Sequence, residues 1–95
     1  MNETPVELRH DENGHQFQGL VDGAPLATMQ YSRRGDALRL EHTVVDSSAR
    51  GRGIGAAFVR AVLDDLRATK TRIAVTCPFV TKFIDQNPEY RTLMR

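Results

Sequence analysis

The stretch Arg50-Gly51-Arg52-Gly53-Ile54-Gly55 lies between two segments with different hydrophobic periods. Residues 37–45 alternate between apolar and polar side chains, as in a strand, whereas residues 54–68 repeat apolar side chains at helical spacing. A helix begins with N–H groups that lack intrahelical acceptors, and its dipole adds about half a positive charge there. The glycines let a ligand approach this backbone, and the arginines add cationic donors. The stretch therefore predicts a phosphate-binding loop at a helix start.

Two common phosphate motifs do not fit this loop. A P-loop requires Gly-Lys followed by Ser or Thr, and no lysine follows Gly55. A dinucleotide fingerprint requires Gly-x-Gly-x-x-Gly, whereas the glycines here occupy every second position. What remains is Arg50-x-x-Gly53-x-Gly55, a short pattern that identifies no function on its own.

Length and composition limit the possible classes of protein. A chain of 95 residues forms one domain, over residues 1–95, with a modest core. Thirteen Lys and Arg against twelve Asp and Glu predict no bulk attraction to nucleic acid, although two pairs, Arg33 with Arg34 and Arg50 with Arg52, are candidates for local basic patches. A single cysteine fits a reducing compartment, and no apolar run approaches the roughly 18 residues of a membrane span. We expect a cytoplasmic protein with no nucleic-acid partner, no membrane partner and no metal.

The first half of the chain reads as an antiparallel meander. Asn13-Gly14 and Asp22-Gly23 are typical two-residue hairpin turns, and Arg34-Gly35-Asp36 turns into a fourth strand. Strict alternation in that fourth strand predicts two rows of side chains. One row contains Leu38, Leu40, His42 and Val44, and the other contains Arg39, Glu41, Thr43 and Val45.

The second half reads as helix, strand and two further helices. The helix over residues 53–68 has a core-facing stripe, and the strand over residues 72–75 is expected to be parallel to the fourth strand through a right-handed crossover. Pro78 suits the first turn of a second helix, with Phe79, Val80, Phe83 and Ile84 as its apolar face. Asn87 is expected to cap a last helix. The predicted fold is α/β, with four antiparallel strands, a fifth strand parallel to the fourth, and three C-terminal helices.

Four segments in this order carry a family resemblance. They are residues 40–45, the glycine loop, Thr76-Cys77-Pro78-Phe79-Val80 and Asn87-Pro88-Glu89-Tyr90. The loop is similar to the Q/R-x-x-G-x-G/A pyrophosphate loop of the GNAT acetyltransferase superfamily, and the set resembles its very small, single-domain members over residues 37–93. The resemblance implies a compact GNAT-like fold and acetyl-CoA, or coenzyme A, as the cofactor.

The resemblance also implies a cofactor site. In GNAT proteins the two parallel strands splay apart, and their free backbone groups hold the pantetheine arm like an added strand. Residues 43–45 and 74–77 would form these edges here, and the glycine loop would bind the pyrophosphate. The cofactor-binding residues implied in this way are Thr43, Val44, Val45, Arg50, Gly51, Arg52, Gly53, Ile54 and Gly55.

Cys77 and His42 are the candidate catalytic residues. Cys77 ends a strand immediately before a helix that begins with Pro78, so the helix dipole favours its thiolate. Such a thiolate can accept an acyl group, with His42 as the base. The alternatives are that Cys77 is a buried thiol or lines the pocket, and that His42 is a core histidine bonded to backbone.

Direct transfer to an amine is the usual GNAT mechanism, and Glu41 as base and Tyr90 as acid are the candidates for it. Each has a structural alternative, Glu41 as a solvated residue and Tyr90 as a packing residue with a hydrogen-bonded hydroxyl. The helical pair after the first strand and the C-terminal strands of larger members, which build the acceptor wall, are not found in residues 1–95, so the acceptor is not predicted. We expect a monomeric or weakly dimeric N-acetyltransferase acting on an amine or protein. The alternative is an acyl-CoA-binding or protein-interaction module that keeps the cleft without catalysis.

Overall fold

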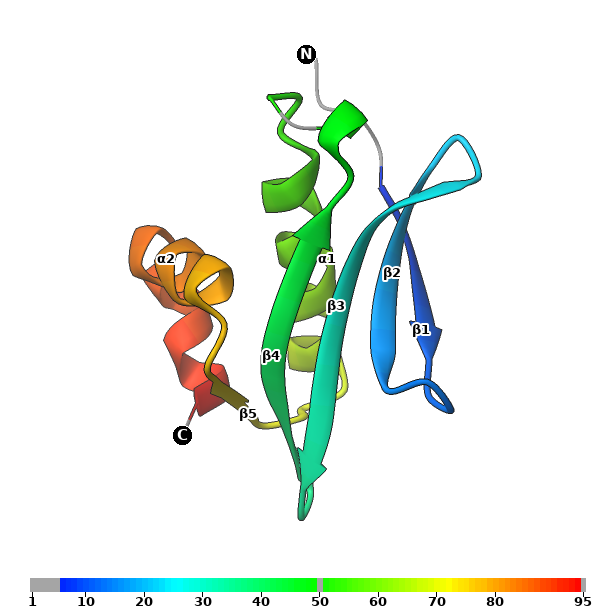
Figure 1. Ribbon diagram of the computed structural model, residues 1–95. Coiled ribbons are helices and arrows are strands. Elements are labelled where there is room, and N and C mark those ends of the chain that lie inside the picture. Colours follow the sequence, from blue (N-terminus) through cyan, green and yellow to red (C-terminus); the bar gives the residue numbers. More distant parts are fainter. Residues whose placement is uncertain (1–5, 50, 95) are drawn as a thin grey trace.

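The fold is a mixed five-stranded sheet with helices packed against it (Figure 1). The computed structural model describes residues 6–49 and 51–94. The strands are β1 Glu7–Asp11, β2 Gln16–Val21, β3 Ala24–Arg34, β4 Ala37–Val45 and β5 Ile73–Val75, and the helices are η1 Ser47–Ala49, α1 Ile54–Ala68, α2 Pro78–Gln86 and η2 Pro88–Met94. Strands β1 to β4 pair antiparallel in chain order, and β5 pairs parallel with β4. The predicted α/β fold is confirmed.

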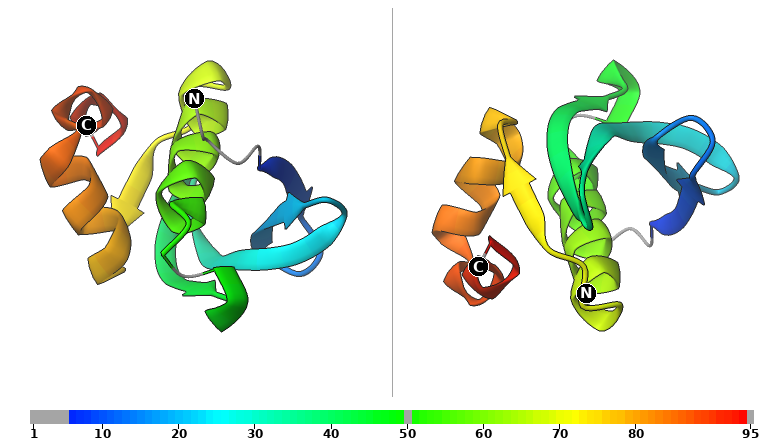
Figure 2. Two further views of the ribbon diagram at one scale, coloured as in Figure 1. Left: turned by 90° about the horizontal axis from the view of Figure 1, so that it is seen from above. Right: turned by 90° about the horizontal axis from the view of Figure 1, so that it is seen from below.

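The amphipathic helix α1 fills the concave side of the sheet. Figure 2 shows the strands curving around α1, with β5 running between α1 and the pair α2 and η2. Phe58, Val59 and Val62 of α1 are fully buried in one core with Met29 and Leu40 of the sheet. The helical stripe predicted from the sequence is therefore the core face, and it anchors the glycine loop at the start of α1.

One of the two predicted hairpin turns is wrong. Asp22 and Gly23 both have positive φ, 52° and 83°, as a two-residue turn of the expected kind requires. The turn between β1 and β2 instead spans residues 12–15. There the Asp11 carboxylate accepts the Gly14 N–H at 3.0 Å and the His15 N–H bonds the Glu12 carbonyl, so the chain reverses over four residues.

A bulge in β4 changes the direction of its side chains. Gln30 pairs with His42 whereas Tyr31 pairs with Leu40, which leaves Glu41 as an extra residue. Before the bulge Leu40 is buried, but after it His42 is exposed and Thr43 takes the inward direction. The predicted row of Leu38, Leu40, His42 and Val44 is therefore wrong from His42 onward, because one extra residue moves all later side chains to the opposite face.

Two predictions for the C-terminal helices are also wrong. Phe79 is 42% exposed, while Val80 and Phe83 of the same helix are buried, so Phe79 is not part of the core face of α2. Asn87 does not cap the last helix with its side chain. It ends α2, where its side chain donates to the Phe83 carbonyl at 2.9 Å and accepts from Arg60 at 3.0 Å.

Candidate functional site

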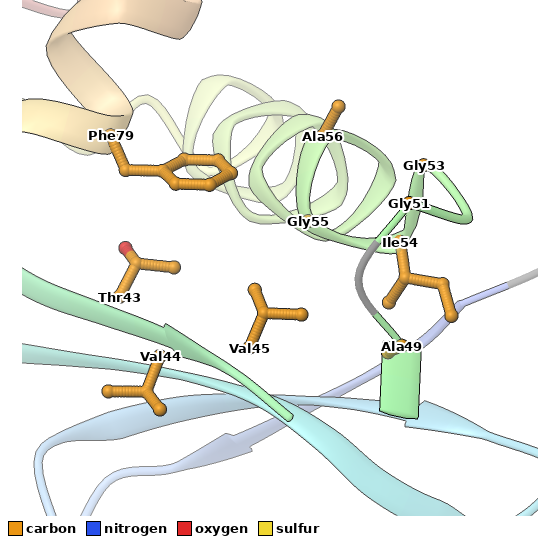
Figure 3. Close-up of a pocket in the computed structure, with 10 residues that line it drawn as sticks. All are labelled: Thr43, Val44, Val45, Ala49, Gly51, Gly53, Ile54, Gly55, Ala56 and Phe79. Carbon is orange, nitrogen blue, oxygen red and sulfur yellow. The ribbon is translucent and has the colours of Figure 1, made fainter. Parts of the chain in front are cut away.

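A cleft of about 570 Å³ opens between the end of β4, the start of α1 and the start of α2 (Figure 3). This volume lies within the range of roughly 300–1,000 Å³ that small-molecule sites occupy. The lining residues are Thr43, Val44, Val45, Ala49, Gly51, Gly53, Ile54, Gly55, Ala56 and Phe79. The glycine loop and β4 thus meet in one cavity.

Most of the predicted cofactor-binding residues line this cleft. Arg52 does not line it, and Arg50 lies outside the described residues. Sequence reasoning missed Ala49, Ala56 and Phe79. The sequence carried a signal for Phe79, because a residue that follows Pro78 at the start of a helix need not face the core. Which of these residues bind a cofactor remains a prediction.

The glycine loop leaves the start of α1 open. Gly51 and Gly53 have φ of 81° and 74°, in the left-handed region that glycine adopts at little cost. Gly53 is the N-cap residue, and no side chain of the described residues caps the helix. A Cβ at Gly51 or Gly53 would have no heavy atom within 4 Å. These glycines therefore shape an accessible backbone, whose first-turn N–H groups favour an anion.

The two parallel strands part before β4 reaches this loop. β5 pairs with β4 only up to Leu40, whose carbonyl accepts the Thr76 and Cys77 N–H groups at 3.0 and 3.2 Å. β5 ends at this point, and the chain that follows it leads away from β4 to α2 (Figure 1). The Asp46 N–H donates to Leu26 of β3, so the alternation of an antiparallel strand directs the backbone groups of Thr43 and Val45 to the unpaired edge. This edge can pair with an extended ligand that carries amides.

Cys77 contacts Thr43 rather than His42. The Cys77 side chain is 3% exposed at the N-cap of α2, and its Sγ lies 3.4 Å from Thr43 Oγ1. Cys77 is not one of the described residues that line the cleft, and no hydrogen bond joins it to His42 in the described part of the chain. His42 is exposed, so its alternative interpretation as a core histidine is wrong.

Glu41, at the bulge, is held by two donors. Its carboxylate accepts from Ser32 Oγ at 2.8 Å and from Arg39 Nε at 3.1 Å. The hydrogen bond from Ser32, followed by the bond and charge of Arg39, lowers the pKa of Glu41 below its ordinary value. Because a carboxylate of lowered pKa takes up a proton less readily, Glu41 is a weaker general base than a free glutamate.

Tyr90 packs the last helix against α1. It is 1% exposed, and its hydroxyl donates to Asp64 at 2.6 Å and accepts from Arg60 at 3.1 Å. The Arg67 guanidinium lies 4.8 Å from the centre of the ring. Burial raises the pKa of Tyr90, and the hydrogen bond to Asp64 adds to this effect. The interpretation of Tyr90 as a packing residue with a bonded hydroxyl is confirmed.

The helices and the metal-ligating side chains of the described residues, 6–49 and 51–94, bear on two further kinds of site. None of their helices has the length and apolar character needed to cross a membrane. Their His, Cys, Asp and Glu side chains form no group of three or more that could hold a metal ion.

The family of the chain follows from its sequence. The family described as GCN5-related N-acetyl-transferase matches residues 16–93, and the chain belongs to this family. Among curated relatives, Protein NATD1 of Bos taurus is 34% identical over 86 residues, which cover 88% of this chain and 76% of the relative. Protein NATD1 of Homo sapiens is 30% identical over 86 residues, with 88% and 76% covered.

Solved structures show the same fold. The solution structure of a GCN5-like protein from Staphylococcus aureus aligns with a TM-score of 0.66 and 19% identity, covering 98% of this chain and 89% of the other. The crystal structure of the ribosomal-protein-S18-alanine N-acetyltransferase from Escherichia coli aligns with a TM-score of 0.57 and 21% identity, covering 70% and 43%. Both support the GNAT-like fold assigned from the sequence.

Proposed function

We propose that the protein is an acetyl-CoA-dependent N-acetyltransferase whose cofactor binds in the cleft between β4, α1 and α2. One observation carries the proposal: an open strand edge and an uncapped, glycine-bounded helix start face the same cavity. The first favours an amide-bearing chain and the second favours a phosphate. Membership of the GCN5-related N-acetyl-transferase family supports the same assignment.

Different residues of the cleft would bind different parts of the cofactor. The first-turn N–H groups of α1 would bind the pyrophosphate, and the free backbone groups of Thr43 and Val45 would pair with the amides of the pantetheine arm. The apolar side chains of Val45 and Phe79 would pack against that arm. Bound acetyl-CoA supplies an acetyl thioester for transfer to an amine of a small molecule or a protein.

Cys77 and His42 are the proposed reacting groups. The Cys77 sulfur would form a bond to the acetyl carbon while the carbon–sulfur bond of the thioester breaks and the coenzyme leaves as a thiolate. His42 would take the proton of the Cys77 thiol. An acceptor amine would then attack the acetyl carbon bound to Cys77, and the Cys77 sulfur would leave. Both residues lie where β4 and β5 part, although the Cys77 sulfur contacts Thr43 and the exposed His42 forms no hydrogen bond with it in the described part of the chain.

The second candidate is an acyl-CoA-binding module without catalysis. The burial of Cys77 and the clamped carboxylate of Glu41 favour it. Intact mass measured after incubation with acetyl-CoA separates the two candidates. One added acetyl group in the parent, absent in Cys77→Ala, supports acyl transfer through Cys77, whereas unchanged mass together with a rise in melting temperature supports binding without acylation of Cys77.

Calorimetry on two matched glycine variants tests the cofactor site. Gly53 and Gly35 have similar φ, 74° and 64°, and a Cβ at either would meet nothing within 4 Å. Valine at each position should cost a similar amount, about 1–2 kcal/mol, for the left-handed backbone. We expect Gly53→Val to abolish acetyl-CoA binding and Gly35→Val, at the tip of β3 and β4, to retain it. A Gly53→Val variant that binds as tightly as the parent would overturn the site.

The calorimetric test does not address the oligomeric state, the location or the nucleic-acid partners of the protein. A monomer or weak dimer, a cytoplasmic location and the absence of a nucleic-acid partner stay predictions. The acceptor is proposed only as an amine.

A further inference from the structure

The C-terminal end of α1 and the start of β5 lie far from the glycine loop, at the opposite end of the helix (Figure 1). A hollow of about 250 Å³ opens there, and the described residues that line it do not line the cleft. They are Arg67, Lys70, Thr71, Arg72, Thr92 and Leu93. Three of these side chains are cations and none is acidic, so the hollow is suited to an anion. Its volume is below the roughly 300–1,000 Å³ of most small-molecule sites, which favours a small anion.

Two of the three cations have no ionic partner among the described residues. The Arg67 guanidinium donates to Asp64 at 3.2 Å, so the charge of Arg67 is compensated. Lys70 and Arg72 are exposed, and within residues 6–49 and 51–94 neither side chain forms an ion pair. The net positive charge of the hollow therefore comes from Lys70 and Arg72, while Arg67 offers its remaining N–H donors.

The end of α1 does not need these two cations as caps. A helix ends in carbonyls without intrahelical donors, and a cation nearby often stabilises them. Here the Asp65 carbonyl accepts the Thr69 N–H at 3.0 Å, and the Leu66 carbonyl accepts the Thr71 N–H at 2.9 Å. The Thr69 hydroxyl lies 3.2 Å from both carbonyl oxygens and donates to them as well. Because these carbonyls are already bonded, the free cations are available to a ligand.

Lys70 stands where a helix end usually has glycine. Its φ is 56°, in the left-handed region, and it directly follows Thr69, the C-cap residue of α1. The bond from the Thr71 N–H back to the Leu66 carbonyl completes a helix-ending motif in which glycine is the usual residue at the position of Lys70. A side chain in this conformation makes the folded state less stable than glycine would. An ammonium group kept at such a position points to a function for its charge.

We propose that this hollow binds a phosphate group between the Lys70 ammonium and the Arg72 guanidinium. Arginine recognises phosphate through two parallel N–H bonds and lysine through its compact charge, so the two cations complement each other. The Thr71 and Thr92 hydroxyls line the same hollow and can donate to the remaining oxygens. The group is either free phosphate or the phosphorylated side chain of a protein. The site lies outside the cleft, so it does not depend on the proposed function.

Backbone amide chemical shifts during titration with inorganic phosphate, at neutral pH and low ionic strength, test the site. The amides of Lys70, Thr71 and Arg72 should shift and saturate, and sodium chloride at equal ionic strength should not reproduce the change. Phosphate that shifts no amide, or only Ile54 and Gly55 at the start of α1, would overturn the proposal.

A short phosphoserine peptide and its unphosphorylated form distinguish the two sources of the phosphate group. If the phosphoserine peptide binds at the same amides more tightly than inorganic phosphate does, the group belongs to a protein. If it binds no more tightly, free phosphate is the ligand. An unphosphorylated peptide that binds as well as the phosphorylated one would contradict a site for phosphate.

Variants of Lys70 separate its charge from its backbone conformation. Lys70→Gly should weaken phosphate binding by roughly three- to tenfold, as the loss of one charge-assisted contact at a partly screened surface allows. The same variant should have a raised melting temperature, because glycine adopts the left-handed conformation at little cost. Lys70→Arg keeps the charge and should keep the affinity.

The matched control is Lys82→Met, which removes the only other lysine of the chain, from the exposed side of α2. This variant should bind phosphate like the parent. An equal loss of affinity in Lys82→Met would show an effect of net charge rather than a site, and would overturn the proposal. A stably folded Lys70→Gly variant that binds phosphate as tightly as the parent would overturn it as well.

Discussion

The two halves of β4 differ in their pairing and in their surroundings. The closed half, residues 37–40, pairs with β3 on one side and with β5 on the other, and its Leu40 is fully buried. The open half, residues 42–45, pairs with β3 alone, and its Val44 is 64% exposed. The bulge at Glu41 separates the halves. One strand thus provides both a part of the core and a wall of the cleft.

The difference shows how a small domain can keep an open strand edge. Unpaired N–H and C=O groups on an edge invite association with other chains unless something covers or shortens that edge. Here the exposed edge is short, and Phe79 at the start of α2 stands across the cleft from it (Figure 3). The open half is therefore suited to binding, while the closed half holds the strand in the core.

Stability measurements should separate the two halves most clearly. Leu40→Ala removes a fully buried side chain and should lower the free energy of unfolding by about 2–5 kcal/mol. Val44→Ala, in the open half, should change it by less than about 0.5 kcal/mol, because the Val44 side chain is exposed. Urea denaturation measures both values. Equal losses for the two variants would contradict the division of β4.

The next prediction concerns the catalytic pair. His42→Asn should preserve the fold, because His42 is exposed, and should slow acylation of Cys77 by roughly 10²- to 10⁴-fold if His42 is the base. Mass spectrometry over time, well below the melting temperature, gives this rate. An unchanged rate in a folded His42→Asn variant would eliminate the pair mechanism.

A smaller effect is expected from Thr43, the residue that contacts the thiol. Thr43→Val keeps the shape of the side chain but removes the hydroxyl that lies 3.4 Å from Cys77 Sγ. Loss of one hydrogen bond should slow alkylation of Cys77 by iodoacetamide by roughly two- to tenfold. Thr43→Ser keeps the hydroxyl and is the control. If the valine and serine variants react at the parent rate, the contact has no influence on the thiol.

Much of this architecture follows from the sequence, but the bulge does not. Periodicity predicted the strand order, α1 and the cleft-lining glycines, because apolar spacing and glycine punctuation act locally. Strict alternation placed His42 on the core face of β4, which is wrong, because a bulge does not change the kinds of residue that make up a strand. Three consecutive polar residues, Glu41, His42 and Thr43, interrupt the alternation of β4 and are a signal that could have revealed the bulge. Phe79 was missed because an aromatic residue at helical spacing usually faces the core.

The smallest expected effect concerns acid stability at the bulge. The donors Ser32 and Arg39 lower the pKa of Glu41 in the folded protein, so their stabilising contribution is present above the ordinary glutamate pKa and is lost as the pH falls through the lowered value. Glu41→Gln should therefore have a slightly lower melting temperature than the parent at neutral pH, and the difference should vanish in acid. A pH-independent difference would show that the carboxylate charge is not what stabilises the bulge.

Backbone amide chemical shifts during titration with acetyl-CoA test the central claim most directly. If the cofactor pairs with the open half of β4 and its pyrophosphate binds the start of α1, the largest changes will occur at Thr43, Val45, Ile54 and Gly55. Leu40, in the closed half, should change little, because its carbonyl already accepts the Thr76 and Cys77 N–H groups. Saturating acetyl-CoA that shifts no amide, or that shifts the closed half more than the open half, would contradict the assignment of the cleft.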